Sequence, residues 1–467
     1  ARVAVACSER FPGKGLPSQG RSGSAAGQGR PIGLPSLREE PVARLEFAGL
    51  MPVYDIQTES GQYLSNNLVV HNCFILSIED DLVGDGGIMD LMTREARLFK
   101  YGSGTGTNYS NLRASMEPLS GGGVSSGLLS FLKVSDRSAS SIKSGGTTRR
   151  AARMVTLDAD HPDVFKYIDW KVQEERKVAS MVTGSRVLRR HTRRVLQACR
   201  PRTDPRSGLH ADGNGAGRFD PKENRELGEA LRAALADEVP AAYLFQLVQL
   251  AEQGVWEYEP EEFTTDWEGE AYNTVSGQSS NNSLRITDAF MKAVIDDGWW
   301  ELTNRIDGKL RQKVRARDIW DKVALAAWLC ADPGLQFHTT INDWHTCPKD
   351  GEIRASNPCS EYMFLDDTAC NLASLNLLAF RDPATGEFRV DDLRHAIRLW
   401  TIVLEVSVLM AQFPSQAIAR KSFDYRTLGL GFANLGTLLM VMGIPYDSAE
   451  GRSIAAALAA IITGEAY

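Results

Sequence analysis

The sequence predicts an α/β protein with a small β unit in front of it. From residue 73 onward, short apolar segments typical of strands alternate with longer segments whose apolar residues have helical spacing. Of the 467 residues, 43% are hydrophobic and 24% charged, as is usual for a globular protein, and the length allows two to four domains. Three short β-type segments separated by turns precede residue 73, at 43–47, 52–57 and 62–71.

The apolar spacing also gives the order of the elements. Strands are expected at 73–78 and 155–157. Helices are expected at 87–101, 125–136, 164–173, 224–237, 240–253, 287–296, 316–330, 391–411, 431–442 and 454–462. Glycine-rich stretches lie at 102–106 and 119–123, and the polar, Pro/Gly-rich segment 200–225 predicts an exposed insertion. Residues 1–41 show no sustained periodicity, which predicts disordered or non-native sequence.

Charge and cysteine usage exclude several classes of protein. A formal net charge of -7 and a pI near 5.7 argue against a nucleic-acid binder. The seven scattered cysteines contain no C-x-x-C pair, so neither a secreted disulfide framework nor a structural zinc site is expected. No apolar run reaches the roughly 20 residues that span a bilayer, and no signal-peptide core is present. We therefore expect a cytoplasmic protein without membrane partners.

The segment Asn357-Pro-Cys-Ser-Glu361 carries the most chemical information. In an extended backbone alternate side chains share a face, so Asn357, Cys359 and Glu361 would line one side of the segment. Pro358 cannot donate to a sheet ladder, which places the segment on a loop or an edge. Cys370 could return to the same site if the chain folds back. The alternative is that both cysteines are buried structural thiols and that Glu361 is a surface charge.

These residues, followed by Ala369-Cys-Asn-Leu372, resemble the finger-loop region of ribonucleotide reductases, closest to the adenosylcobalamin-dependent class II. Further motifs of that family occur in its order across 73–467. They are Cys73-Phe-Ile-Leu, Asn111-Leu-Arg, Pro118-Leu-Ser-Gly-Gly-Gly123, Lys143-Ser-Gly-Gly-Thr-Thr-Arg-Arg150, Asp160-His-Pro-Asp163, Asn281-Asn-Ser-Leu-Arg-Ile286, Asp332-Pro-Gly-Leu335 and Tyr425-Arg-Thr-Leu-Gly-Leu-Gly431. The resemblance implies that 73–467 is the catalytic barrel, a partial ten-stranded α/β barrel.

The resemblance implies a role for each matching residue. Cys359 matches the thiyl-radical cysteine that abstracts the ribose 3′-hydrogen, Glu361 the base for the 3′-hydroxyl, and Asn357 the amide that binds the sugar hydroxyls. Cys73 and Cys370 match the redox pair that supplies two electrons and becomes a disulfide. These residue types suit that chemistry, because a dithiol stores two electrons reversibly and a carboxylate moves a proton.

The resemblance also implies binding sites and partners. Ser103 and Gly104 match the backbone that approaches the ribonucleotide substrate. Asp80 and Arg113 match positions that bind a nucleoside triphosphate effector. The loop that links effector to substrate matches Lys143, Ser144, Gly145, Gly146, Thr147, Thr148, Arg149 and Arg150; its alternative reading is a solvated basic turn. The implied cofactor is adenosylcobalamin, and the implied partners are a thioredoxin-like or glutaredoxin-like reductant and a second copy in a homodimer.

Residues 42–72 resemble the C-terminal splicing segment of an intein. Val53-Tyr-Asp-Ile56 leads to Val69-Val-His-Asn-Cys73, in which Cys73 would accept the acyl group, Asn72 would cyclise, and His71 would assist proton transfer. Gly61 or its neighbours stand where such segments often have a second histidine. No N-terminal splicing block is evident, although Cys7 is a weak candidate for its nucleophile. Cleavage at Asn72 is therefore expected rather than complete splicing.

Three functions follow from this sequence. The first is reduction of ribonucleotides to deoxyribonucleotides for DNA synthesis, on the pattern of a ribonucleoside-diphosphate reductase, although the sequence does not discriminate di- from triphosphates. The second is an intein fragment with an inert reductase flank, and the third is a related radical enzyme with another substrate. Because no matches are seen to the family's N-terminal helical region, later strands, phosphate loop or C-terminal cysteines, we expect a fragment that is inactive alone.

Overall fold

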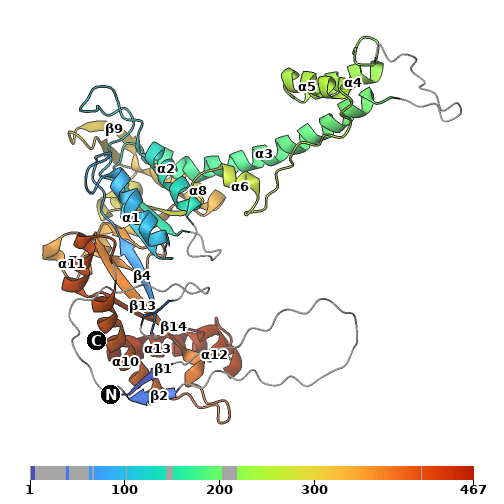
Figure 1. Cartoon of the computed structure of the whole chain (residues 1–467). Helices are drawn as coiled ribbons and strands as arrows, with labels where there is room; N and C mark the ends of the chain where they lie inside the picture. The colour runs from blue at the N-terminus through green and yellow to red at the C-terminus, as the bar shows by residue number, and fades with distance from the viewer. Residues whose placement is uncertain are drawn as a thin grey trace, which may run out of the picture. The chain divides into compact units, whose positions relative to one another are not determined.

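The computed structural model describes residues 73–100, 102–142, 151–201, 218–411 and 413–467, together with the backbone of β1 (Arg2–Val5), β2 (Arg38–Pro41), β3 (Tyr63–Ser65) and the part of β4 that starts at Leu68. β1 and β2 pair antiparallel, and β3 pairs antiparallel with β4. Apart from these strands, the predicted segments 1–41 and 42–72 lie outside the described residues, as does the predicted loop 143–150. The chain divides into two compact units (Figure 1). Unit 1 comprises Ala1–Leu112, Ser138–Leu157 and Gln336–Tyr467, and unit 2 comprises Arg113–Arg137 and Asp158–Leu335.

A mixed sheet forms the centre of unit 1. Within unit 1, the main path of this sheet runs in spatial order through β6 (Arg153–Asp158), β5 (Gly104–Asn108), β4 (Leu68–Ile75), β13 (Thr368–Asn376) and β14 (Leu428–Ala433). The pairs β4–β5, β5–β6 and β13–β14 are parallel, whereas β4 and β13 are antiparallel. The strand expected at 155–157 is confirmed within β6, whereas the strand expected at 73–78 is shifted, because β4 starts at Leu68 and ends at Ile75. The glycine-rich stretch at 102–106 instead begins a strand, because its neighbours on both sides supply ladder partners.

Helices connect and cover these strands. They are α1 (Ile88–Lys100), α9 (His338–Asp343), α10 (Val390–Met410), α11 (Gln416–Tyr425), α12 (Leu435–Met442) and α13 (Ala449–Ala466), with short 3-10 turns at Pro348–Asp350 and Leu377–Phe380. The helix predicted at 391–411 is confirmed. The helix predicted at 431–442 starts later, at Leu435, because the chain up to Ala433 pairs with β13. Ser448 caps α13 by accepting a hydrogen bond from the Gly451 N–H at 3.0 Å.

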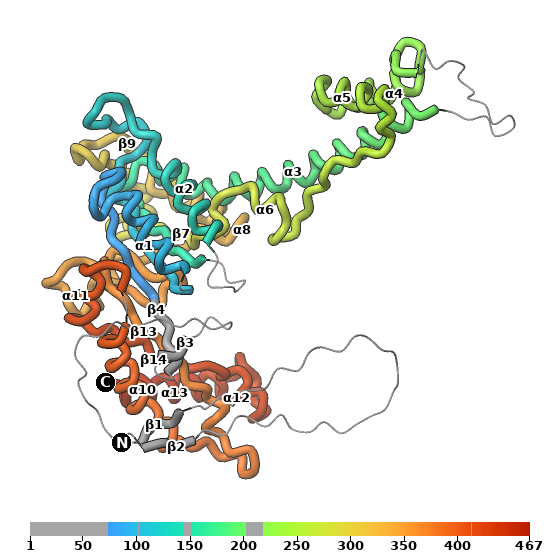
Figure 2. Tube along the Cα trace, viewed as in Figure 1, coloured from blue at the N-terminus to red at the C-terminus, as the bar shows by residue number. Residues whose placement is uncertain are grey.

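Unit 2 is built around a long helix. α3 runs from Val164 to Cys199, so the helix predicted at 164–173 is correct in place but too short. Its buried apolar residues recur at helical spacing beyond residue 173, at Val178, Val182 and Val195, and Pro201 follows its end. Figure 2 shows α4 (Arg225–Ala236) and α5 (Ala241–Glu252) beside the C-terminal part of α3, where they share one apolar core.

The other end of α3 packs in a second apolar core of unit 2. This core includes Ile168 of α3 together with Phe290 and Ile319. The remaining elements of the unit are α2 (Leu128–Ser141), α6 (Glu270–Thr274), β7 (Ser280–Ile286), α7 (Asp288–Ile295), β8 (Trp299–Thr303), β9 (Leu310–Arg315), α8 (Ala316–Cys330) and β10 (Gly334–Phe337). The helices predicted at 224–237, 240–253, 287–296 and 316–330 are confirmed. Among the described residues, no helix combines the length and apolar character that crossing a bilayer requires.

Candidate active site

The two predicted redox cysteines face each other on adjacent strands of the sheet of unit 1. Cys73 of β4 and Cys370 of β13 are direct partners in the antiparallel register. Opposed residues of an antiparallel pair project to the same face with Cα atoms about 4.5–5.5 Å apart, within the range that a disulfide bridges. The fold therefore brings together two thiols that are 297 positions apart (370 − 73), as expected if the chain folds back.

The segment from Asn357 to Glu361 is a turn, so the expectation of one extended face is wrong. It connects β11 (Ala355–Ser356) to β12 (Met363–Phe364), which pair as an antiparallel hairpin. The Asn357 N–H donates to the Tyr362 carbonyl at 3.1 Å, and the Ser360 N–H donates to the Asn357 carbonyl at 3.1 Å. Ser360 has a φ of 66°, which reverses the chain. The loop position inferred from Pro358 is confirmed.

Glycines in β5 let this turn lie directly on the sheet. A Cβ at Gly104 would stand 2.8 Å from the Pro358 ring, and a Cβ at Gly106 would stand 1.6 Å from the Ser356 carbonyl oxygen. Gly104 is also the parallel-register partner of Cys73. The predicted substrate-binding residues Ser103 and Gly104 thus lie at the start of β5, next to the redox strand and under the turn.

Two side chains of the turn converge on Cys73. The Asn357 amide donates from Nδ2 to the Cys73 Sγ at 3.2 Å, and the Cys73 thiol in turn donates to Glu361 Oε1 at 3.9 Å. Asn357 is fully buried, whereas Cys359 and Glu361 are exposed. The turn therefore holds an amide and a carboxylate on the redox pair and presents the Cys359 thiol outward.

The two redox thiols have different surroundings. Burial raises the pKa of Cys370 to about 12, and the neighbouring Cys73 and Glu361 add to the effect. Cys370 is 4% exposed, whereas Cys73 is only partly buried. Cys370 is therefore a protonated thiol at neutral pH.

Tyr362 is a site residue that the sequence analysis did not single out. Its N–H donates to Asn357 Oδ1 at 3.0 Å, and its hydroxyl donates to Thr368 Oγ1 at 2.7 Å and lies 3.1 Å from Thr427 Oγ1. Burial raises its pKa, with Cys370 and Cys73 contributing. Tyr362 thus connects the turn to β13 two residues before Cys370. The sequence signal for this role is that Tyr362 directly follows the motif Asn357-Pro-Cys-Ser-Glu361.

The described structure does not test the remaining predicted residues as a site. Asp80 follows β4 in unit 1, and Arg113 belongs to unit 2, where it donates to the Pro118 carbonyl at 3.0 Å. The predicted loop 143–150 and the side chains of His71 and Asn72 lie outside the described residues. The effector and splicing sites therefore stay predictions.

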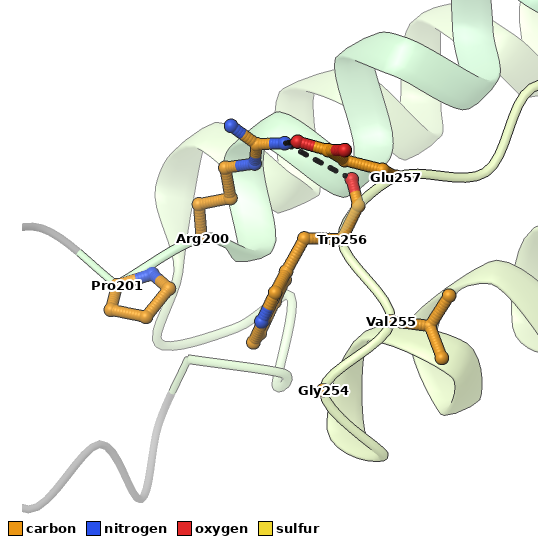
Figure 3. Close-up of a pocket in the computed structure, with 6 residues that line it drawn as sticks. All are labelled: Arg200, Pro201, Gly254, Val255, Trp256 and Glu257. Carbon is orange, nitrogen blue, oxygen red and sulfur yellow. Dashed lines mark hydrogen bonds and ion pairs between the residues drawn. The ribbon is translucent and has the colours of Figure 1, made fainter.

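Unit 2 has a separate surface hollow of about 580 Å³ near the end of α3 (Figure 3). It is lined by Arg200, Pro201, Gly254, Val255, Trp256 and Glu257. Arg200 crosses it to the Trp256 carbonyl at 3.3 Å and to Glu257 Oε1 at 3.5 Å. None of the predicted site residues lines this hollow, and its charged side chains are solvent-accessible, so we assign it no role in catalysis.

Fold and site together define an α/β protein in which a cross-strand thiol pair meets an Asn–Cys–Glu turn. Comparison with known families gives a match to the family described as "Ribonucleotide reductase, barrel domain" over residues 71–467. The chain therefore belongs to the ribonucleotide reductase family, and the expected barrel-type α/β fold is confirmed.

Curated relatives agree with this assignment. The chain is 60% identical over 397 residues to a protein of Agrobacterium fabrum and 57% identical over 397 residues to one of Bradyrhizobium diazoefficiens, each named vitamin B12-dependent ribonucleotide reductase. A Streptomyces avermitilis protein of the same name is 38% identical over 401 residues. The matches cover 85% of this chain but 30%, 31% and 33% of those relatives. The chain thus spans about a third of the length of these relatives.

Proposed function

We propose that this barrel reduces ribonucleotides to deoxyribonucleotides by radical chemistry. The observation that carries the proposal is the convergence of Asn357 and Glu361 on Cys73, which stands in register with Cys370. An amide, a carboxylate and a dithiol around one polar site fit the removal of a hydroxyl group, which needs proton transfer and two electrons. The names of the relatives support the same activity.

Each side chain has a distinct step in this proposal. The Cys359 thiyl radical takes the ribose 3′-hydrogen and later returns a hydrogen atom to the same carbon. Glu361 accepts the 3′-hydroxyl proton, and the Asn357 amide hydrogen-bonds the sugar hydroxyls. Cys73 and Cys370 give up two protons and two electrons and become a disulfide, while the 2′-hydroxyl leaves as water. Atoms and electrons therefore balance with one dithiol oxidised per ribose reduced.

We propose adenosylcobalamin as the cofactor, as the names of the vitamin B12-dependent relatives suggest. When bound, it supplies the hydrogen-atom abstraction that starts the radical chemistry. The Cys359 thiol is exposed, as is required of a thiol that gives its hydrogen atom to a bound cofactor. Apolar side chains pack behind the turn in a cluster that includes Ile75, Phe364 and Leu365, and the buried Cys370 is part of this cluster.

We further propose a ribonucleoside diphosphate substrate, because a Mycobacterium tuberculosis relative, 26% identical over 387 residues, is named a vitamin B12-dependent ribonucleoside-diphosphate reductase. Asp80, Arg113 and the loop 143–150 would bind the nucleoside triphosphate effector. A thioredoxin-like or glutaredoxin-like protein would restore the dithiol, and two copies would form a homodimer. These assignments rest on the family motifs in the sequence.

A second candidate function is peptide cleavage at the junction before Cys73. The tripeptide His71-Asn72-Cys73 favours it, since a side-chain amide next to the scissile bond can cyclise. In this proposal residues 42–72 act as the splicing segment and leave Cys73 as a new N-terminus.

The reductase is tested by assaying deoxynucleotide formation from a ribonucleoside diphosphate, adenosylcobalamin and a dithiol. Because the chain spans about a third of its relatives, it is assayed alone and together with a polypeptide that supplies the remaining length. We expect product in the complemented reaction. A complemented, folded complex that binds adenosylcobalamin but forms no deoxynucleotide would contradict the proposal.

A further inference from the structure

The redox pair is asymmetric in its contacts. Cys370 is buried on β13, where a Cβ at Gly429 would stand 3.2 Å from its Sγ, and its thiol donates to the Asn371 carbonyl at 3.7 Å. Cys73 is partly exposed and contacts two polar side chains of the turn. A reagent from solvent therefore meets Cys73 first.

The amide on Cys73 is fixed in one orientation. The Tyr362 N–H donates to Asn357 Oδ1 at 3.0 Å, so the oxygen faces the backbone and Nδ2 faces the Cys73 sulfur. An N–H donor stabilises a thiolate relative to a thiol. Glu361 has the opposite effect, because its carboxylate accepts from the thiol and repels the thiolate.

We propose that thiol–disulfide exchange enters the redox pair at Cys73, and that Asn357 promotes and Glu361 restrains the reactivity of this thiol. The inference rests on the proposed function of the pair and adds its polarity, by which we mean which of the two thiols reacts first with an external reagent. Cys370 is the second, sheltered thiol, which reacts only with the Cys73 sulfur beside it. Burial raises the pKa of Cys370 to about 12, in agreement with that role.

The exchange is balanced in both directions. In oxidation, the Cys73 thiolate attacks one sulfur of a small disulfide, and the other sulfur leaves as a thiolate. Cys370 then loses its proton to solvent and attacks the Cys73 sulfur, which releases the second thiolate and closes the Cys73–Cys370 disulfide. In reduction, one thiolate of an external dithiol attacks the Cys73 sulfur, and Cys370 leaves and takes up a proton. The second thiol of the dithiol then attacks the external sulfur of this mixed disulfide, which closes the disulfide of the reagent and releases Cys73. Two electrons are transferred in each direction.

Several groups that bear on a pH effect lie near Cys73 among the described residues. They include Glu361 and Asn357 from the turn, Tyr362 beyond them, Cys370 from β13 and Gly104, the register partner of Cys73 in β5. Glu361 is the carboxylate among them. Changing Asn357 and Glu361 separately therefore tests both proposed influences.

The first experiment measures the alkylation rate of each cysteine in the full chain with iodoacetamide, by peptide mass spectrometry between pH 6 and pH 9. We expect Cys73 to react at least about tenfold faster than Cys370. Asn357→Asp should slow Cys73 about threefold to tenfold at pH 7, and Glu361→Gln should accelerate it by a similar factor, as expected for shifts of up to about one pKa unit. A turn that was merely loosened would speed up Cys73 in both variants, which would overturn the proposal.

Asn371→Asp is the matched control. Asn371 is another buried asparagine beside a redox cysteine, but its amide donates to Ser407 Oγ at 2.8 Å and not to a thiol. The same chemical change there should leave the alkylation rate of Cys73 within about twofold of the rate in the unaltered chain. Melting curves of all variants identify any that fail to fold, and Glu361→Gln, at an exposed position, keeps the test decisive if Asn357→Asp unfolds.

The second experiment uses oxidised glutathione. The Cys370→Ser variant should accumulate a mixed disulfide at Cys73, whereas Cys73→Ser should form almost none at Cys370. If the unaltered chain forms no Cys73–Cys370 disulfide, the proposed redox function fails. If that disulfide forms but the mixed disulfide is found at Cys370 in Cys73→Ser as readily as at Cys73 in Cys370→Ser, only the inference of polarity fails.

Discussion

The carbonyl oxygen of Ser356 occupies the position that a side chain at Gly106 would need, 1.6 Å from its ideal Cβ. Ser356 is fully buried at the end of β11, and Gly106 lies in β5 next to the strand that carries Cys73. This close approach seats the turn of Asn357, Cys359 and Glu361 on the sheet. Glycine is required at position 106 because the Ser356 carbonyl oxygen leaves no room for a Cβ, and not because of a positive φ.

We therefore expect Gly106→Ala to displace the turn. Because the obstructing atom is backbone, the hairpin must move, and we expect a loss of about 1–3 kcal/mol in the free energy of unfolding. Chemical denaturation measures this loss. Gly121→Ala is the control, since no atom lies within 4 Å of its Cβ position, and it should change stability by less than about 0.5 kcal/mol.

In the complemented enzyme, Cys359→Ser should abolish both turnover and any substrate-dependent radical signal. An O–H bond is much harder to homolyse than an S–H bond, so a serine cannot carry the radical. Cys370→Ser should retain radical formation but form less than one deoxynucleotide per chain, because the remaining Cys73 thiol alone cannot supply two electrons. Deoxynucleotide formation and electron paramagnetic resonance measure the two outcomes. Sustained turnover by Cys370→Ser would remove it from the redox pair.

Asn72→Ala should prevent release of residues 1–72. The proposed cleavage needs a side-chain amide that attacks its own peptide carbonyl, and alanine has none. Incubation of the purified chain, followed by mass spectrometry, detects a new N-terminal cysteine at Cys73. Release that continues in the variant at the same rate would exclude Asn72 from the reaction.

Acid should weaken unit 2 through Asp160. Burial by itself would raise the pKa of Asp160, but the hydrogen bonds and charge of Arg305 outweigh it, so the pKa lies below its usual value. A carboxyl with a lowered pKa in the folded state stabilises above its unfolded pKa of about 3.9 and loses this contribution as the pH falls through its folded pKa.

Asp160→Asn should therefore lower the melting temperature at pH 7 by about 2–4 °C, the shift that about 1 kcal/mol causes in a unit of this size. The difference from the unaltered chain should narrow below about pH 4. Asp321→Asn removes a carboxylate that forms an exposed ion pair with Arg317 at 3.2 Å, and it serves as the control, with little change expected at either pH. If the melting temperatures of the unaltered chain and Asp160→Asn differ by the same amount at pH 7 and at pH 3, the assignment to Asp160 is contradicted.

The sequence by itself determined the fold class, the family motifs and the residue types of the site. Apolar spacing located most helices correctly, because it reflects local burial on one face, as in the helix from Val390 to Met410. It underestimated α3, whose later turns alternate buried apolar residues with arginines that pair with residues far along the chain, such as Arg189 with Glu262. Local periodicity does not contain such pairings.

Only the tertiary structure decided how the site residues meet. The sequence suggested one extended face for Asn357, Cys359 and Glu361, but the β11–β12 pairing makes a turn of them and separates the outward thiol from the inward amide. The register of β4 with β13 pairs Cys73 with Cys370, 297 positions further along the chain (370 − 73), and Tyr362 contacts both Thr368 of β13 and Thr427. Such contacts are set by sheet pairing and by close backbone approach, which no local pattern of residues specifies.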